Sequence, residues 1–309
     1  MRSPIFWFGG KGNMVKKLLP YCDVPHQIYV EPYGGGASLL FAKRPSPVEV
    51  YNDLDGGLVN FFKVLANPDL FARFHRQVAL LPYSRQLYYE ATEKCQCLEE
   101  ILKEDKVEWA VAFFVAVRQA FSGCFGSSWS LALNASRRGM AMTVSRWLSA
   151  INRLPEVYAR LQRVQIEHKD GIEIIKLYDT PETFFYVDPP YPHETRTDTR
   201  YQQDSVDHEA LLDVLLNVQG YVLLSSYPNE LYSARLQDWA CEEIQTGCYV
   251  VGRTRASKLQ GKGAALANAP RTECIWANSH LIEAVEKGQH AFAFVGNNGN
   301  GHSDLVQLL

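Results

Sequence analysis

The sequence lacks the features that mark secreted, membrane-spanning and zinc-binding proteins. Its seven cysteines are odd in number and scattered, and no Cys-x-x-Cys motif occurs, which argues against a disulfide framework or a zinc site. The N-terminus has no basic segment followed by an apolar one, so we expect no signal peptide. The longest apolar run, residues 109–117, is far shorter than the roughly 20 residues that span a bilayer. We therefore expect a soluble, cytoplasmic protein with no membrane partner.

An excess of positive charge is absent as well. The formal net charge is −3 and the sequence pI is about 6.3, so no global field attracts nucleic acid and any polyanion must meet a local patch. The hydrophobic fraction of 47% and the charged fraction of 21% are typical of a folded globular protein. A length of 309 residues suits one large α/β domain with an insertion, or two small domains.

The most informative motif is Asp188-Pro189-Pro190-Tyr191. It follows residues 184–187, an apolar run with the aromatic and β-branched content of a buried strand. Asp188 is therefore expected at the carboxyl end of a strand, where open α/β sheets bind ligands. A carboxylate, a fixed carbonyl and an aromatic ring in four residues suit a flat base with an exocyclic amine. Taken alone, a strand that ends in an ordinary proline-rich turn explains the motif equally well.

A glycine-rich turn, Gly34-Gly35-Gly36, follows another strand-like segment at residues 28–31. This is the arrangement of a nucleotide-binding first βα turn, although Leu39 stands where the dinucleotide fingerprint needs its third glycine. A ligand with a ribose and an amino-acid moiety is therefore favoured over a pyrophosphate. Asp53 ends the next predicted strand, where an acidic residue commonly binds ribose hydroxyls. The alternative for Asp53 is a helix cap.

The alternation of strands and helices is lost between about residues 67 and 165. Residues 107–121 are predicted to form a buried helix that carries Arg118 near its end. A loop rich in glycine, serine and aromatic residues follows at 121–129. From Arg118 to Arg163 there are seven arginines and one acidic residue, a local charge excess that suits phosphates and base edges. A solvated helical face accounts for some of these arginines. We expect a mainly helical insertion that contacts nucleic acid.

The alternation returns with a strand expected at 164–170 and a helix at 172–177. Strands at 184–187 and 221–226 continue it, so the fold class is α/β with a doubly wound sheet. Two polar or basic loops, 193–204 and 253–271, are expected beside the site or on DNA.

The chain resembles the Dam-like DNA adenine-N6 methyltransferases, the D12 class with an Asp-Pro-Pro-Tyr motif. The motifs that carry the resemblance occur in the order Trp7, Gly9-Gly10-Lys11, Glu31-Pro32-Tyr33-Gly34, Asp53 and Asp188-Pro189-Pro190-Tyr191. The resemblance implies a Rossmann-like methyltransferase sheet with an inserted, mainly helical DNA-recognition domain, in a bacterial or phage-encoded enzyme. It places the catalytic, cofactor-binding domain at residues 1–66 and 166–279, the recognition insertion at 67–165, and a tail of unknown role at 280–309.

The resemblance also assigns residues to S-adenosylmethionine, the implied cofactor. The residues expected to bind it are Trp7, Gly10, Lys11, Glu31, Tyr33, Gly34, Gly36, Asp53, Asp170 and Asp188. The catalytic residues would be Asp188, Pro189, Pro190 and Tyr191, and the DNA-binding residues Arg118, Arg137, Arg138 and Arg146. Gly171 departs from the family, because relatives carry an aromatic after the acid that Asp170 matches. Arg271-Thr272-Glu273 is similar to the closing motif of phage-like members.

The expected chemistry is methylation of an adenine that is flipped out of double-stranded DNA. Asp188 and the Pro189 carbonyl would accept the N–H bonds of the amine and support the charge that develops on attack, while Tyr191 stacks on the base. No metal or covalent nucleophile is required. The alternatives are a methyltransferase for RNA adenine or protein glutamine, and a catalytically impaired DNA-binding relative. Glutamine-directed relatives usually carry Asn at position 188. A cognate restriction endonuclease, the target sequence and the oligomeric state stay open.

Overall fold

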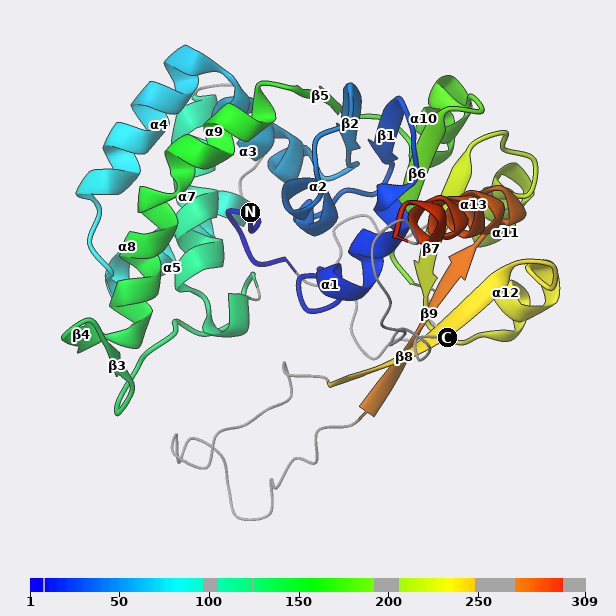
Figure 1. Ribbon diagram of the computed structural model, residues 1–309. Coiled ribbons are helices and arrows are strands. Elements are labelled where there is room, and N and C mark those ends of the chain that lie inside the picture. The colour runs from blue at the N-terminus through cyan, green and yellow to red at the C-terminus, as the bar shows by residue number, and fades with distance from the viewer. Residues whose placement is uncertain (8, 97–104, 124, 192–205, 248–269, 297–309) are drawn as a thin grey trace.

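The computed structural model describes residues 1–7, 9–96, 105–123, 125–191, 206–247 and 270–296 (Figure 1). Its strands are β1 (Ile28–Glu31), β2 (Val48–Asn52), β3 (Ser136–Arg137), β4 (Met140–Ala141), β5 (Val164–Glu167), β6 (Thr183–Val187), β7 (Tyr221–Ser226), β8 (Ala240–Gly247) and β9 (Pro270–Ala277). The helices before β5 are α1 (Val15–Leu18), η1 (Leu19–Asp23), α2 (Ser38–Ala42), α3 (Gly56–Ala66), α4 (Pro68–Leu80), α5 (Arg85–Gln96), α7 (Lys106–Gln119), η2 (Phe121–Gly123), α8 (Met142–Asn152) and α9 (Leu154–Leu161). The later helices are α10 (Gly171–Tyr178), α11 (His208–Leu215), α12 (Glu230–Arg235) and α13 (Ser279–Gly296).

A seven-stranded sheet organises the fold, with the strand order β5-β2-β1-β6-β7-β9-β8. The five strands from β5 to β7 are parallel, and β9 runs antiparallel to both β7 and β8. The strand order reverses at β1, which pairs with β2 on one side and β6 on the other. Ligands of open α/β sheets bind at such a reversal, outside the carboxyl ends of the strands. The predicted α/β class is confirmed.

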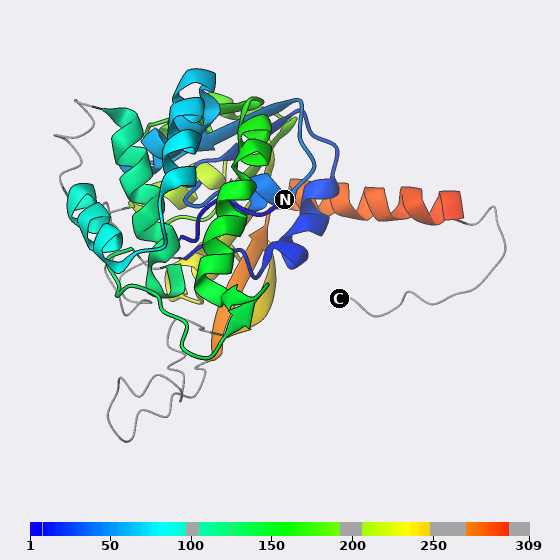
Figure 2. The same ribbon diagram turned by 90° about the vertical axis from the view of Figure 1, so that its left-hand side faces the viewer.

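Successive side chains of the central strands point to opposite faces of the sheet, and each face has its own apolar core. In β6, Phe184 and Tyr186 belong to the core that includes side chains of α1 to α5, α7 to α9 and α13, whereas Phe185 and Val187 belong to the core that includes α10 to α12. Helices cover both faces of the sheet (Figure 1). The sequence of β6 is therefore continuously apolar and does not alternate between apolar and polar residues. Figure 2 shows α13 extending away from the rest of the molecule. None of the described helices is long and apolar enough to cross a membrane.

Side-chain caps set where several helices begin. Asp55 accepts hydrogen bonds from the backbone N–H groups of Gly57 and Leu58, which satisfies donors that the first turn of α3 leaves without partners. Helix α3 therefore begins at Gly56. Asn67, Asp105, Asp170, Asp207 and Asn229 cap α4, α7, α10, α11 and α12 in the same way.

Helices α4 to α9 pack on the sheet through a shared core and a buried ion cluster. Their buried side chains belong to the same apolar cluster as those of α2 and α3. Arg160 in α9 donates hydrogen bonds to both carboxylate oxygens of Glu49 in β2, at 2.5 and 2.8 Å, and Lys43 contacts the same carboxylate at 2.7 Å. Glu49 is fully buried, so Arg160 ties these helices to the sheet. Whether residues 67–165 form a separate domain stays a prediction.

The ion cluster predicts a large cost for Glu49→Ala. This change leaves two buried cations without their carboxylate, and we expect the free energy of unfolding to fall by about 3–5 kcal/mol. The control is Lys94→Ala, which removes an exposed ion pair with Glu108 and should cost less than about 1 kcal/mol. Urea unfolding measures both. Equal, small losses in the two variants would contradict the anchoring role of Glu49.

Candidate functional site

The predicted motifs meet at the carboxyl edge of the parallel strands. The glycine-rich turn follows β1, Asp53 follows β2 and Asp188 follows β6. Because β1 pairs in parallel with both β2 and β6, these three segments end at the same edge of the sheet. Lys11 reaches that edge from the N-terminal segment, where it contacts Asp188. The structure thus brings together residues that lie far apart in the sequence.

A largely buried ion pair between Lys11 and Asp188 forms the centre of the site. The ammonium nitrogen of Lys11 lies 2.7 Å from Oδ1 and 2.9 Å from Oδ2 of Asp188, and it donates a third hydrogen bond to the Gly9 carbonyl at 3.0 Å. Burial alone would lower the pKa of Lys11, but the Asp188 and Glu273 carboxylates raise it above its ordinary value. Burial raises the pKa of Asp188, and Lys11 opposes that change.

Tyr191 lies over this ion pair with its hydroxyl group between two carboxylates. Its oxygen is 2.7 Å from Oε2 of Glu273 and 3.3 Å from Oδ1 of Asp188. The Lys11 ammonium lies 4.8 Å from the centre of the ring, and Tyr227 meets the ring edge-on at 4.4 Å. Sequence reasoning gave Glu273 no role at the site. The sequence signal that could have identified Glu273 is its position in the Arg271-Thr272-Glu273 motif.

Asp53 holds the glycine-rich turn. Its two carboxylate oxygens accept hydrogen bonds from the backbone N–H groups of Gly35 and Asp55, both at 2.8 Å, while the Tyr51 hydroxyl group donates to the Gly35 carbonyl at 2.9 Å. Burial raises the pKa of Asp53 to about 6, against the effect of the two N–H groups. The chain needs glycine at position 34, because a Cβ there would lie 2.3 Å from the Tyr51 ring. Asp55, and not Asp53, caps α3.

Trp7 packs against the same turn. A Cβ added at Gly35 or Gly36 would lie 3.0 Å from the Trp7 side chain. The Gly10 N–H donates to the Trp7 carbonyl at 3.0 Å, which turns the chain toward Lys11. The indole also lies against Phe113 of α7, at 5.8 Å between ring centres. Trp7 therefore joins the N-terminal segment, the turn and the helical half of the protein.

Glu31 is buried beneath the turn, with a relative exposure of 1%. Its Oε1 accepts hydrogen bonds from the Tyr29 hydroxyl group at 2.8 Å and from the Leu40 N–H at 2.7 Å. Burial raises the pKa of Glu31 to about 7, opposed by these two donors. Glu31 thus connects the end of β1 to the first turn of α2, and its role toward a cofactor stays a prediction.

Tyr33 occupies the space beside Gly171. A Cβ added at Gly171 would lie 2.4 Å from Cζ and 2.7 Å from the hydroxyl oxygen of Tyr33. Asp170 itself accepts hydrogen bonds from the N–H groups of Ile172 and Glu173 at the start of α10. The aromatic ring beside Gly171 therefore comes from the segment after β1, whereas the relatives that the chain resembles carry an aromatic residue directly after the acid that Asp170 matches.

The four arginines expected on DNA lie in or beside α7, β3, β4 and α8. Arg137 at the end of β3 and Arg138 on the turn to β4 are both exposed, and Arg146 is exposed on α8. Arg118 is different, because its buried Nε has no hydrogen-bond partner and its guanidinium lies 4.7 Å from the Phe6 ring. Burial, with Arg153 and Arg146 nearby, lowers the pKa of Arg118 to about 10.

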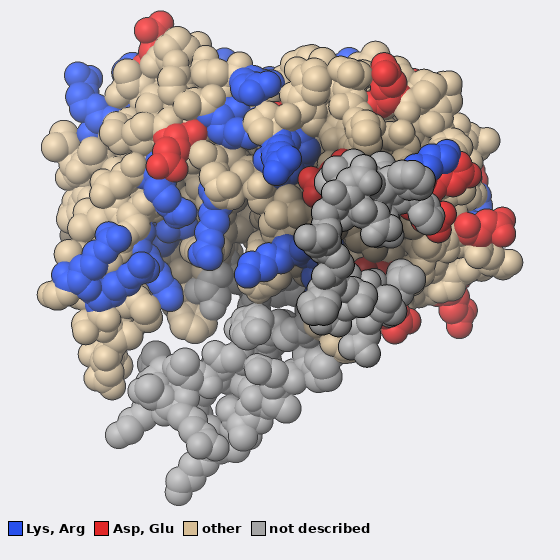
Figure 3. Space-filling view, viewed as in Figure 1, with Lys and Arg blue, Asp and Glu red and all other residues tan. Residues whose placement is uncertain are grey.

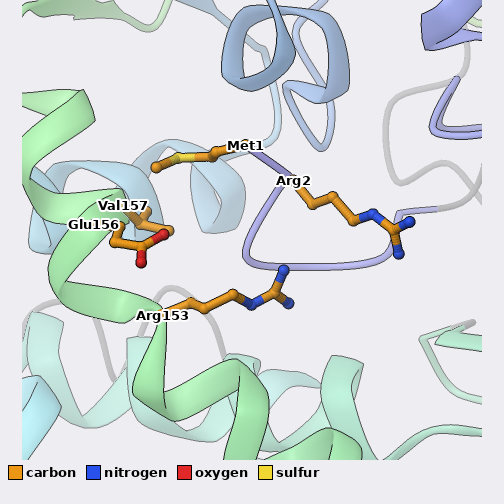
Figure 4. A pocket seen from close by; sticks show the side chains of 5 residues that line it. All are labelled: Met1, Arg2, Arg153, Glu156 and Val157. Carbon is orange, nitrogen blue, oxygen red and sulfur yellow. The ribbon is translucent and has the colours of Figure 1, made fainter.

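Positive side chains gather on one face of the molecule. Figure 3 shows Lys and Arg side chains collected where α8, β3 and β4 lie, whereas acidic side chains lie mainly toward α10, α11 and α12. A cavity of about 260 Å³ opens on the same half of the protein, and Figure 4 shows Arg153 extending across it toward the N-terminal segment. Its lining residues are Met1, Arg2, Arg153, Glu156 and Val157.

The proximity of Tyr33 to Gly171 predicts the effect of a small substitution. Gly171→Ala should gain up to about 1 kcal/mol of helix propensity, but we expect a net loss of about 1–3 kcal/mol because the new methyl group meets the Tyr33 ring. In a Tyr33→Ala background the same change should become neutral or stabilising. Chemical unfolding of the four proteins measures this coupling. Gly288→Ala in α13, where nothing lies within 4 Å, is the control. Stabilisation by Gly171→Ala in the wild-type background would contradict the prediction.

Comparison with known protein families identifies one match. The family model described as D12 class N6 adenine-specific DNA methyltransferase matches residues 7–245, which is more than half of the chain. The matched segment contains Trp7, Lys11, Asp53 and the Asp188-to-Tyr191 motif.

Proposed function

Because the chain belongs to the family of D12 class N6 adenine-specific DNA methyltransferases, we propose that it methylates N6 of a flipped adenine in double-stranded DNA, with S-adenosylmethionine as the donor. The observation that carries the proposal is the buried cluster of Lys11, Asp188 and Tyr191 at the carboxyl end of β6. It lies at the edge of the sheet where the strand order reverses, beside a turn without side chains.

The residues at this edge fit the proposed cofactor. S-adenosylmethionine carries a methyl group on a positively charged sulfur, which makes that methyl group open to attack by an amine. The two carboxylates of Asp188 and Glu273 outnumber the single positive charge of Lys11. The remaining negative charge favours binding of a cationic ligand such as the sulfonium group. Asp53 follows β2, at a position where an acidic residue commonly binds ribose hydroxyls, and Gly34 to Gly36 allow a ligand to approach the backbone closely. Trp7 offers an aromatic surface beside them.

Asp188 and its neighbours fit the work of activating an adenine amine. The lone pair of that amine is delocalised into the ring, so the amine is a weak nucleophile. A carboxylate has about four acceptor sites, and Lys11 uses two of those on Asp188. The remaining sites and the Pro189 carbonyl would accept the two N–H bonds, which stabilises the positive charge that develops on nitrogen during attack. Pro189 and Pro190 stiffen the backbone that positions both acceptors.

A flipped base also needs an aromatic surface and a bound duplex. Tyr191 supplies the ring, since stacking on an aromatic side chain stabilises a base that has left the helix. The arginines supply the contact with DNA. In the part of the chain that the structure describes, no carboxylate pairs with Arg118, Arg137, Arg138 or Arg146. A half-buried guanidinium that has no carboxylate partner among the described residues, as in Arg118, would be stabilised by an incoming phosphate.

The proposal predicts methyl transfer that depends on Asp188. The wild-type protein should transfer a labelled methyl group from S-adenosylmethionine to unmethylated duplex DNA, and not to RNA of the same sequence. Asp188→Ala should reduce the rate by about 100-fold or more, and Asp188→Asn should keep part of it because the amide retains a carbonyl acceptor. Asp213→Ala, which removes an exposed acid paired with Arg235, serves as the control. Transfer to RNA alone, or a normal rate in Asp188→Ala, would refute the proposal.

A second prediction concerns Arg137 and Arg138, the exposed arginines of the hairpin that β3 and β4 form. Replacing both Arg137 and Arg138 by alanine should weaken DNA binding without changing cofactor affinity. If these side chains contact phosphates, DNA affinity will fall by the same factor for all sequences. The slope of the logarithm of the binding constant against the logarithm of salt concentration will then become shallower by about one for each lost contact. If they read bases, the methylated sequence will relax at defined positions, at about 1–3 kcal/mol per lost contact.

The matched control is Lys176→Ala, an exposed cation in α10 on the other side of the sheet. DNA binding should be unchanged in that variant. Unchanged affinity and unchanged sequence preference in the double arginine variant would show that the hairpin is an ordinary solvated surface.

A further inference from the structure

Glu273 places a second buried carboxylate at the site, beside Asp188. It lies in β9, one residue before Cys274, which pairs with Ser226 of β7. Its relative exposure is 8%. The hydrogen bond that it accepts from the Tyr191 hydroxyl group, at 2.7 Å, joins residues 82 positions apart. A buried carboxylate so close to the catalytic one raises the energy of the site, so its presence calls for a functional reason.

The hydroxyl group of Tyr191 has one proton and two neighbouring acceptors. A phenol can donate a single hydrogen bond. The distance to Oε2 of Glu273 is 2.7 Å, whereas the distance to Oδ1 of Asp188 is 3.3 Å. The shorter distance is in the normal range for a hydrogen bond between oxygens and the longer one lies outside it. The proton therefore points to Glu273, and Oδ1 of Asp188 receives none from Tyr191.

Lys11 cannot replace Tyr191 as the donor to Glu273. An ammonium group has three protons, and three acceptors lie within 3.0 Å of Nζ, namely both oxygens of Asp188 and the Gly9 carbonyl. Glu273 is 3.9 Å from the same nitrogen, beyond hydrogen-bond distance. Among the described residues, the close side-chain contact of Glu273 at the site is thus the one with Tyr191.

The Tyr191 ring is also held without Glu273. Tyr227 packs edge-on against it at 4.4 Å, with an angle of 69° between the rings, and the Lys11 ammonium lies 4.8 Å from its centre. These contacts fix the ring position, so Glu273 is left to control the hydroxyl proton.

We infer that Glu273 is a positioning residue that takes the Tyr191 proton and so keeps Oδ1 of Asp188 free to accept the N–H of the target adenine. Without Glu273, the hydroxyl group rotates and donates to Asp188, where it competes with the amine. This inference rests on the proposed function. It differs from a simple bracing role, in which Glu273 holds the ring through the hydroxyl group.

The two roles predict opposite results for a double variant. With cofactor and DNA saturating, Glu273→Ala should slow a single turnover of methyl transfer by about 10- to 100-fold, the effect of one hydrogen bond to a charged group. Tyr191→Phe alone should have an effect of less than about threefold, because the ring remains. Combining the two changes should restore the rate to within about threefold of Tyr191→Phe, because the competing proton is gone. A bracing role predicts no recovery.

Glu273→Gln repeats the test with a side chain of nearly the same shape. A neutral amide oxygen accepts more weakly than the Asp188 carboxylate, so the rate should fall by at least about threefold and recover when Tyr191→Phe is added. Glu243→Ala, an exposed acid in the neighbouring strand β8, is the control and should match the wild-type rate. Thermal unfolding checks that each variant is folded.

The outcomes separate this inference from the proposed function. If the wild-type protein transfers no methyl group to adenine, the proposed function fails. If the wild-type protein is active, two results overturn the inference alone: normal rates in both Glu273 variants, or Glu273 variants that stay slow when Tyr191 is also replaced by phenylalanine.

Discussion

The ion pair between Lys11 and Asp188 is the interaction on which the site depends. It places a cation from the N-terminal segment against the carboxylate that ends β6, in a place from which solvent is largely excluded. Removing either partner leaves a buried charge without compensation, which costs several kcal/mol. The pair also positions what lies next to it, since Lys11 is close to Tyr191 on one side and follows Trp7 and the turn of Gly9 and Gly10 on the other.

A second buried ion cluster gives the helical half of the protein a fixed position relative to this site. Arg160 joins α9 to Glu49 of β2, and the shared apolar core extends that contact. The basic surface of α8, β3 and β4 is therefore held at a constant distance from the carboxyl edge of the sheet. Under the proposed function a fixed distance matters, because misplacement of reacting groups by about 1 Å is enough to slow a reaction severely.

Local sequence patterns predicted the parts of the fold that are encoded locally. Apolar runs that end on an acid or a glycine turn indicated β1, β2 and β6, and the position of Asp188 followed from them. Contacts between distant segments escaped prediction. Glu273 reaches the site because β9 pairs antiparallel with β7, a pairing that no local pattern reveals.

Similar limits apply to Tyr33 and Arg160. The ring of Tyr33 fills the space at Gly171 from a segment more than a hundred residues earlier in the chain, and this was not visible in the sequence. Arg160 looks like its neighbouring arginines in sequence, yet its charge is used inside the protein, on Glu49. Charge counts cannot distinguish the two uses, because burial decides between them. The loop expected at 193–204 and most of the one at 253–271 lie outside the described residues.

The spacing of the site residues along the chain has a consequence for the synthesis of the protein. Lys11 and Asp188 are 177 positions apart, and Glu273 follows Tyr191 by 82 more. At about 5–20 residues per second, roughly 9–35 s pass on the ribosome between the appearance of the lysine and that of its carboxylate. Glu273, the last residue of the cluster, is synthesised later still. Contacts between residues so far apart in the sequence also form slowly during folding. A nascent or truncated chain that ends before β9 carries the arginines of residues 118–163 but lacks Glu273, so the cluster around Asp188 is incomplete until the last strand has been made.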